Sequence, residues 1–176
     1  MWNLLLFCTA AFAQAPEPSA ARQTLEKQLD GFEKQLLGLA EAMPADKYAF
    51  TPPSDGFRGV RNFARQLKHA AAYHYLVAAA ILGEAPPADA ADERGPESAK
   101  SKAEVTGYVR DSFAYLRKAL AAIDDRNLVA PMKSLFGKGS ATRLGLFTSA
   151  IIHSSNHYGQ LVEYLRMNGA VPPASQ

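Results

Sequence analysis

The stretch that decides the fold class runs from Ser140 to Gly169 and reads SATRLGLFTSAIIHSSNHYGQLVEYLRMNG. Side chains that recur every three or four residues lie on one face of a helix. In this stretch they form a single stripe, which comprises Leu146, Ala150, His153, His157, Gln160 and Tyr164. We expect Ser140 to cap the helix and Gly169 to follow its last turn, because glycine readily adopts the left-handed conformation found there.

The same period recurs in three earlier parts of the chain. Apolar stripes predict helices over residues 20–43, over residues 62–82 and from about residue 101 to residue 123. Asn62 is the expected N-cap of the second of these helices, and Gly83 is its expected stop. Ser101 and Glu104 have the spacing of a capping box, inside or at the start of the third helix. No segment alternates as a strand does, so we predict an all-α four-helix bundle without a sheet.

The composition agrees with one globular domain. The chain has 176 residues, of which 48% are hydrophobic and 20% are charged. A chain of this length can bury a core without disulfide bonds. The formal net charge is only +2, and no basic stripe interleaved with aromatic residues is present. We therefore expect no nucleic-acid partner.

Residues 1–13 are expected to be a secretory signal peptide. They contain a short apolar run that ends in Ala11-Phe12-Ala13, a cleavage pattern of the A-x-A type. The run is too short to span a bilayer, so we expect no stable membrane anchor after cleavage. The alternative is a buried N-terminal helical turn. Cleavage would remove Cys8, the one cysteine, and would leave a secreted or periplasmic domain over residues 14–176.

Chemistry concentrates in the four histidines, which are His69, His74, His153 and His157. The i, i+4 spacing of His153 and His157 lets both imidazoles reach one metal ion. The alternative is a pair of core histidines bonded to other side chains. A third ligand would come from the second helix, where helical geometry leaves His69 and His74 both open and the apolar stripe slightly favours His74.

Three segments resemble the DinB family. Residues 60–71, VRNFARQLKHAA, are similar to its second-helix signature, with a histidine six positions after a phenylalanine. Residues 43–52, MPADKYAFTP, resemble the connection between its first two helices. The stretch over residues 153–173 closely resembles its closing helix. The resemblance covers most of the chain after the signal peptide.

This resemblance implies a four-helix bundle with an up-down-down-up order, in a family whose members are often homodimers. It also implies a metal site with His69, His153 and His157 as ligands and with His74 outside it. Three neutral imidazoles suit Zn²⁺, Ni²⁺ or Fe²⁺ and leave a coordination position open. We expect binding to weaken as pH falls through about 6.5, the ordinary pKa of an imidazole.

The resemblance leaves the reaction open. Relatives in the wider superfamily include transferases and isomerases that use a low-molecular-weight thiol such as bacillithiol or mycothiol. We expect a metal-dependent enzyme acting on a small-molecule substrate, either thiol S-transferase-like or hydrolytic. The alternative is a non-catalytic metal-binding or stress-associated envelope protein. No catalytic residue is identified from the sequence, and no acidic residue is evident beside the histidines.

Two further residues are candidates for supporting the site. Gln160 lies one turn after His157 and could orient a ligand, although a surface position is equally compatible with the sequence. Tyr73 lies four residues after His69, on the same helix face, where it could donate a hydrogen bond near the metal or simply pack in the core.

Overall fold

A computed structural model describes residues 18–53, 58–135 and 138–175 of the chain. The predicted signal peptide, residues 1–13, lies outside the described residues and stays a prediction. Among residues 18–53, 58–135 and 138–175, no helix is both long enough and apolar enough to cross a membrane.

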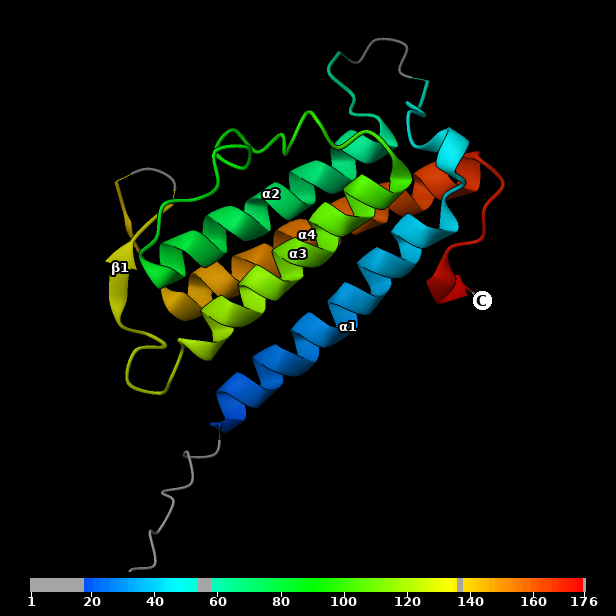
Figure 1. The fold of residues 1–176 in the computed structure, drawn as a ribbon. Coiled ribbons are helices and arrows are strands. Elements are labelled where there is room, and N and C mark those ends of the chain that lie inside the picture. Colours follow the sequence, from blue (N-terminus) through cyan, green and yellow to red (C-terminus); the bar gives the residue numbers. More distant parts are fainter. Residues whose placement is uncertain (1–17, 54–57, 136–137, 176) are drawn as a thin grey trace, which may run out of the picture.

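The described residues form the predicted all-α bundle (Figure 1). Its four long helices are α1 (Ala20–Ala42), α2 (Phe63–Leu82), α3 (Lys102–Ala121) and α4 (Arg143–Met167). In Figure 1, α1 and α4 run in one direction and α2 and α3 run in the other, which is the up-down-down-up order. Short 3₁₀ helices follow α1 (Ala45–Lys47) and α4 (Pro173–Ser175).

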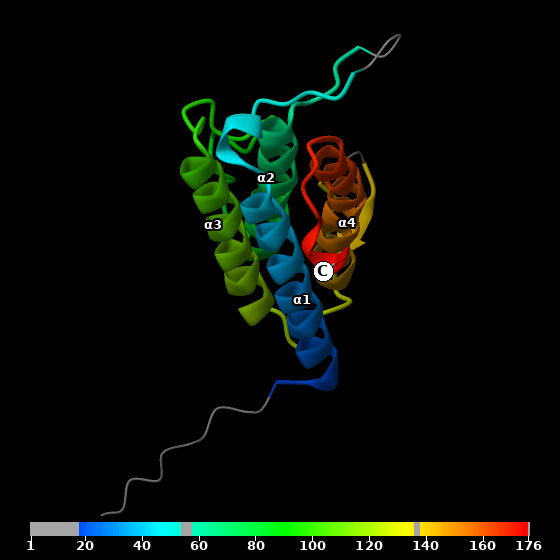
Figure 2. The ribbon, with the colours of Figure 1, turned by 90° about the vertical axis from the view of Figure 1, so that its right-hand side faces the viewer.

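The neighbours of each helix follow from this order. Both α1 and α2 pack against α3 and α4, and Figure 2 shows α3 and α4 on either side of α1. Because α2 and α3 are parallel neighbours, the chain between them must return along the whole bundle. Residues 83–101 make this return beside α2 (Figure 1).

Local capping explains where most helices begin and end. The Asn62 side chain accepts a hydrogen bond from the backbone N–H of Arg65 at 2.8 Å, as an N-cap does. Gly83 ends α2 with a φ of 71°, a conformation that favours glycine. Ser101 and Glu104 form a complete capping box at the start of α3. These predicted boundaries are confirmed.

The start of α4 differs from the prediction. Two short strands, β1 (Pro131–Lys133) and β2 (Ser140–Thr142), pair in an antiparallel ladder before the helix. Ser140 is paired with Lys133 and therefore cannot cap a helix. Thr142 is the N-cap instead, and its side chain accepts from the backbone N–H of Gly145 at 3.0 Å. The expectations of a Ser140 cap and of a chain without any sheet are wrong.

The core lies between the four helices. Its largest fully buried side chains include a phenylalanine from each of α2, α3 and α4, namely Phe63, Phe113 and Phe147. Helix α1 contributes Leu29, Leu36 and Leu39 to the same core, and each is 0% exposed. Burying side chains of this size contributes about 1.5–3 kcal/mol each, so this core stabilises the packing of α2 against α4.

Candidate metal centre

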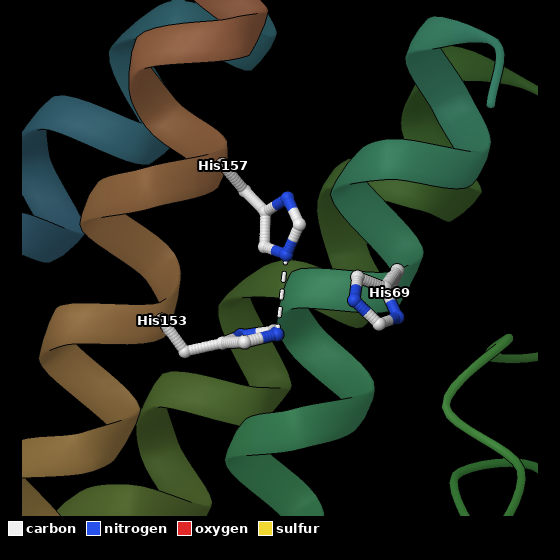
Figure 3. A group of neighbouring side chains, drawn as sticks. All are labelled: His69, His153 and His157. Carbon is white, nitrogen blue, oxygen red and sulfur yellow. Dashed lines mark hydrogen bonds between the residues drawn. The ribbon is translucent and has the colours of Figure 1, made fainter. Parts of the chain in front are cut away.

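Three of the four histidines meet between α2 and α4. His69 comes from α2, and His153 and His157 leave the same face of α4, one turn apart (Figure 3). One ring nitrogen from each of the three lies within 4.8 Å of the others. The structure thus brings together the three histidines that the family resemblance implied.

The spacing of the ring nitrogens fits coordination of one ion. The Nε2 atoms of His153 and His157 are 3.1 Å apart. Two nitrogens bound tetrahedrally at about 2.0–2.1 Å from one zinc ion lie about 3.3 Å apart. The two α4 histidines are therefore already at the separation of paired ligands, and closing the third onto the same ion needs a side-chain adjustment of about 1–2 Å.

Burial keeps these imidazoles neutral. His69 is 6% exposed and His157 is 9% exposed. Burial lowers the pKa of His153 to about 3 and that of His157 to about 4, with the positive charge of neighbouring groups adding to the effect. Burial also lowers the pKa of His69. Since a metal binds the neutral ring, proton competition begins below the pH of about 6.5 expected from an ordinary imidazole.

His69 is oriented by the connection between α2 and α3. The backbone oxygen of Glu93 lies 2.8 Å from Nδ1 of His69 and accepts its proton, which leaves Nε2 free as a ligand. Glu93 adopts a φ of 59°, which is uncommon for a residue other than glycine. Its carboxylate is 3.7 Å from the same Nδ1 atom. An acidic residue thus lies beside the site, contrary to the prediction, and it is on the side of the ring away from the cluster.

His157 is held by a chain of side-chain amides. The Gln66 amide lies 2.6 Å from Nδ1 of His157 and donates to Oε1 of Gln160 at 2.6 Å. Gln160 in turn donates to Asn156. With the Gln66 nitrogen donating, Nδ1 accepts and the ring proton sits on Nε2. If the Gln66, Gln160 and Asn156 amides all make a half-turn, the Gln66 oxygen accepts from Nδ1–H, the other two contacts are kept, and Nε2 is free for a metal ion.

These amides were only partly foreseen from the sequence. Gln66 was not predicted, although it precedes His69 by one helical turn and could have been noticed for that reason. It is 2% exposed, which is rare for glutamine. Gln160 reaches the site through Gln66 but is exposed. It does not lie on the buried face of α4, where Ser154 and Leu161 take the inward positions.

His153 is held by stacking rather than by a hydrogen bond at its second nitrogen. The Tyr73 ring stacks on it at 4.2 Å between ring centres, and the Tyr73 hydroxyl lies 3.1 Å from Oγ of Ser149. Of the two roles considered for Tyr73, the structure shows packing: its ring lies against His153, and its hydroxyl contacts Ser149 of α4. Nδ1 of His153 is buried and has no hydrogen-bond partner among the described residues. The nitrogen of this ring that faces His157 is Nε2.

His74 lies outside the cluster. It is 0% exposed, with Nδ1 2.9 Å from Oγ of Ser112 and Nε2 2.5 Å from Oγ of Ser154. Ser112 donates its own proton to the backbone oxygen of Val109, so it accepts from Nδ1–H and Nε2 accepts from Ser154. Both ring nitrogens are used, and His74 links α2, α3 and α4 in the core.

Comparisons with known proteins agree with this architecture. A DinB-like protein from Bacillus cereus superposes with a TM-score of 0.69 at 14% sequence identity, over 86% of this chain and 95% of that one. A conserved protein from Enterococcus faecalis superposes with a TM-score of 0.64 at 17% identity, over 82% of this chain and 94% of that one. At these identities the likeness shows the fold alone.

Sequence comparison adds the family. No curated protein is similar enough to this chain to count as a relative. The sequence profile of the DinB superfamily, however, matches residues 28–161, a span that includes α2, the three clustered histidines and most of α4. Because the matched residues make up more than half of its length, the chain belongs to the DinB superfamily.

Proposed function

We propose that His69, His153 and His157 bind one divalent transition metal ion and that the protein is a metal-dependent enzyme. The observation that carries this proposal is the convergence of three neutral imidazoles at the spacing of metal ligands. Such a cluster of polar rings in a bundle core would otherwise be costly.

The donor set favours Zn²⁺, Ni²⁺ or Fe²⁺, because imidazoles suit these ions and the three rings supply no carboxylate or thiolate. Three protein ligands leave a position for water or substrate. An ion in this site would polarise a substrate or lower the pKa of a bound water or thiol. The chain's own contribution is orientation, with Glu93 holding His69 and Gln66 holding His157.

For the reaction, we propose transfer to or from a small thiol, or hydrolysis of a small-molecule substrate. The two are separated by their requirements. Product formation that needs both the metal and an added low-molecular-weight thiol supports the transferase, whereas metal-dependent turnover without thiol supports the hydrolase. Absence of both activities in metal-loaded protein would favour a non-catalytic metal-binding protein.

We also propose that the protein works outside the cytoplasm after removal of residues 1–13. Sequencing the N-terminus of the native protein tests this directly. A chain that begins near Gln14 in an envelope or secreted fraction supports export. An intact Met1 in the cytosolic fraction contradicts it.

Metal stoichiometry tests the ligand set. We expect about one ion per chain in the wild type and loss of most of the affinity in His69→Ala, His153→Ala and His157→Ala. The matched control is His74→Gln, which alters the buried histidine outside the cluster and should keep its metal. Each variant is checked for folding by circular dichroism. A folded wild type that binds no transition metal at micromolar concentration would refute the proposal, as would loss of metal in the control alone.

A further inference from the structure

A strongly basic pocket lies at the N-terminal end of α2, the helix that carries His69. Its cavity measures about 310 Å³ and lies between the N-terminal end of α2 and the connection that follows this helix. Four positively charged residues and one acidic residue line it, together with two glycines; the charged residues are Arg61, Arg65, Lys68, Arg94 and Glu97. We call this cavity the basic pocket.

The positive charge of the basic pocket is largely unpaired. Among the described residues, neither Arg61 nor Arg65 forms an ion pair. Arg94 pairs with Asp92 at 3.0 Å, where both side chains are exposed. A surplus of guanidinium groups in a concave site attracts anions, and guanidinium presents paired donors that match carboxylate and phosphate oxygens.

Hydrogen bonds from Lys68 hold one wall of the basic pocket in place. Nζ of Lys68 donates to the backbone oxygen of Pro96 at 2.7 Å and to that of Ala99 at 3.1 Å, which ties the connection to α2. Gly95 has a φ of 70°, and a Cβ atom there would come within 2.9 Å of Cβ of Lys68. This close approach brings the backbone of the connection against α2 at the basic pocket.

The basic pocket and the histidine cluster share their supports. Arg65 precedes His69 by one turn of α2, and Arg94 directly follows Glu93, whose backbone oxygen accepts from His69. Arg65 and Arg94 therefore lie on the same two segments of the chain that place and orient His69.

We propose that the basic pocket binds an oxyanion, a carboxylate or a phosphate, carried by a substrate whose reacting end lies at the three histidines. Arg61 and Arg65 are the principal contacts, because both line the cavity and neither forms an ion pair among the described residues. As a substrate site the pocket rests on the proposed metal centre, whereas anion binding in itself does not.

The first experiment measures anion binding without metal. Inorganic phosphate and acetate are titrated by calorimetry into metal-free protein from which the chelator has been dialysed. We expect saturable binding to the wild type and weakening by about 10-fold in Arg61→Gln and in Arg65→Gln, since charged hydrogen bonds are lost. Phosphate and acetate together show which oxyanion the pocket prefers. The matched control is Arg110→Gln on α3, an exposed arginine outside the pocket, which should bind as the wild type does.

The second experiment links the pocket to the histidines. Cobalt-loaded protein is titrated with 3-mercaptopropionate, which carries a carboxylate, and with 2-mercaptoethanol, which does not. The thiolate-to-cobalt absorption band reports binding. We expect the carboxylate-bearing thiol to bind about 10-fold more tightly to the wild type. This preference should disappear in the Arg61→Gln, Arg65→Gln double variant, whose cobalt content should be unchanged.

The two experiments fail in different ways. Absence of saturable phosphate and acetate binding, or equal weakening in Arg110→Gln, overturns the anion site. Anion binding without any thiol preference overturns the link to the histidines. A protein that binds phosphate but no cobalt refutes the proposed metal function and leaves the anion site standing.

Discussion

Replacing His74 by glutamine should destabilise the protein at neutral pH and should cost almost nothing at pH 5. Glutamine has a similar length and can donate and accept, but it does not titrate. At pH 7.5 we expect a loss of about 1–3 kcal/mol in the free energy of unfolding, because the paired contacts to Ser112 and Ser154 are disturbed in a fully buried site.

The pH dependence follows from the lowered pKa of His74. Burial, with the positive charge of His153 as a smaller cause, lowers this pKa from 6.5 to about 3. Between these two values the unfolded chain binds a proton that the folded chain does not, so the stability contributed by neutral His74 is present above pH 6.5 and is lost as pH falls. By pH 5 the wild type has lost about 2 kcal/mol through this residue, and the variant has not.

Urea unfolding of both proteins at several pH values from 7.5 to 5 measures the effect. The clustered histidines titrate in both proteins, so the difference between wild type and variant isolates His74. We expect this difference to shrink by about 2 kcal/mol on going to pH 5. A difference that stays constant over this range would show that His74 is not buried in the neutral form, and the reasoning would be refuted.

Three more predictions concern the site and its supports. Gln66→Leu should weaken metal affinity by about 10–100-fold in chelator competition, because His157 loses the amide that orients it; unchanged affinity would contradict this role. Metal binding should persist at pH 5.5 and fail nearer pH 4, since the pKa of His157 is about 4; loss at pH 6.5 would contradict it. Gly95→Ala should lower the free energy of unfolding by more than about 1 kcal/mol in urea titrations, because a side chain there is strained and crowds Lys68; an unchanged midpoint would contradict it.

The parts of the fold that the sequence predicted are those determined locally. Asn62 and Gly83 act on the turns next to them, and an apolar stripe extends over a whole helix. The hairpin before α4 was missed because strands of three residues are too short to show alternation. Ser140 has the chemistry of a cap, but pairing with Lys133 keeps it in the strand.

The site was predictable only where neighbours in sequence are also neighbours in space. The i, i+4 spacing brought His153 and His157 together, whereas choosing His69 over His74 required the family resemblance. Glu93 could not be foreseen, because its contact with His69 depends on a return connection held by Lys68. The basic pocket was missed for the same reason, since Arg94 meets Arg61 and Arg65 only when that connection packs.

The up-down-down-up order has a consequence for how the protein matures. His157 contacts Gln66 across 91 positions in the sequence, and α3 and the hairpin must be placed before α4 can reach α2. Joining segments so far apart is slow and entropically costly. The local pair on α4 lies within one helix, whereas His69 and the connection that orients it come from distant parts of the sequence. A partly folded chain therefore presents a two-histidine site of low affinity, and metal retention should report on completion of folding.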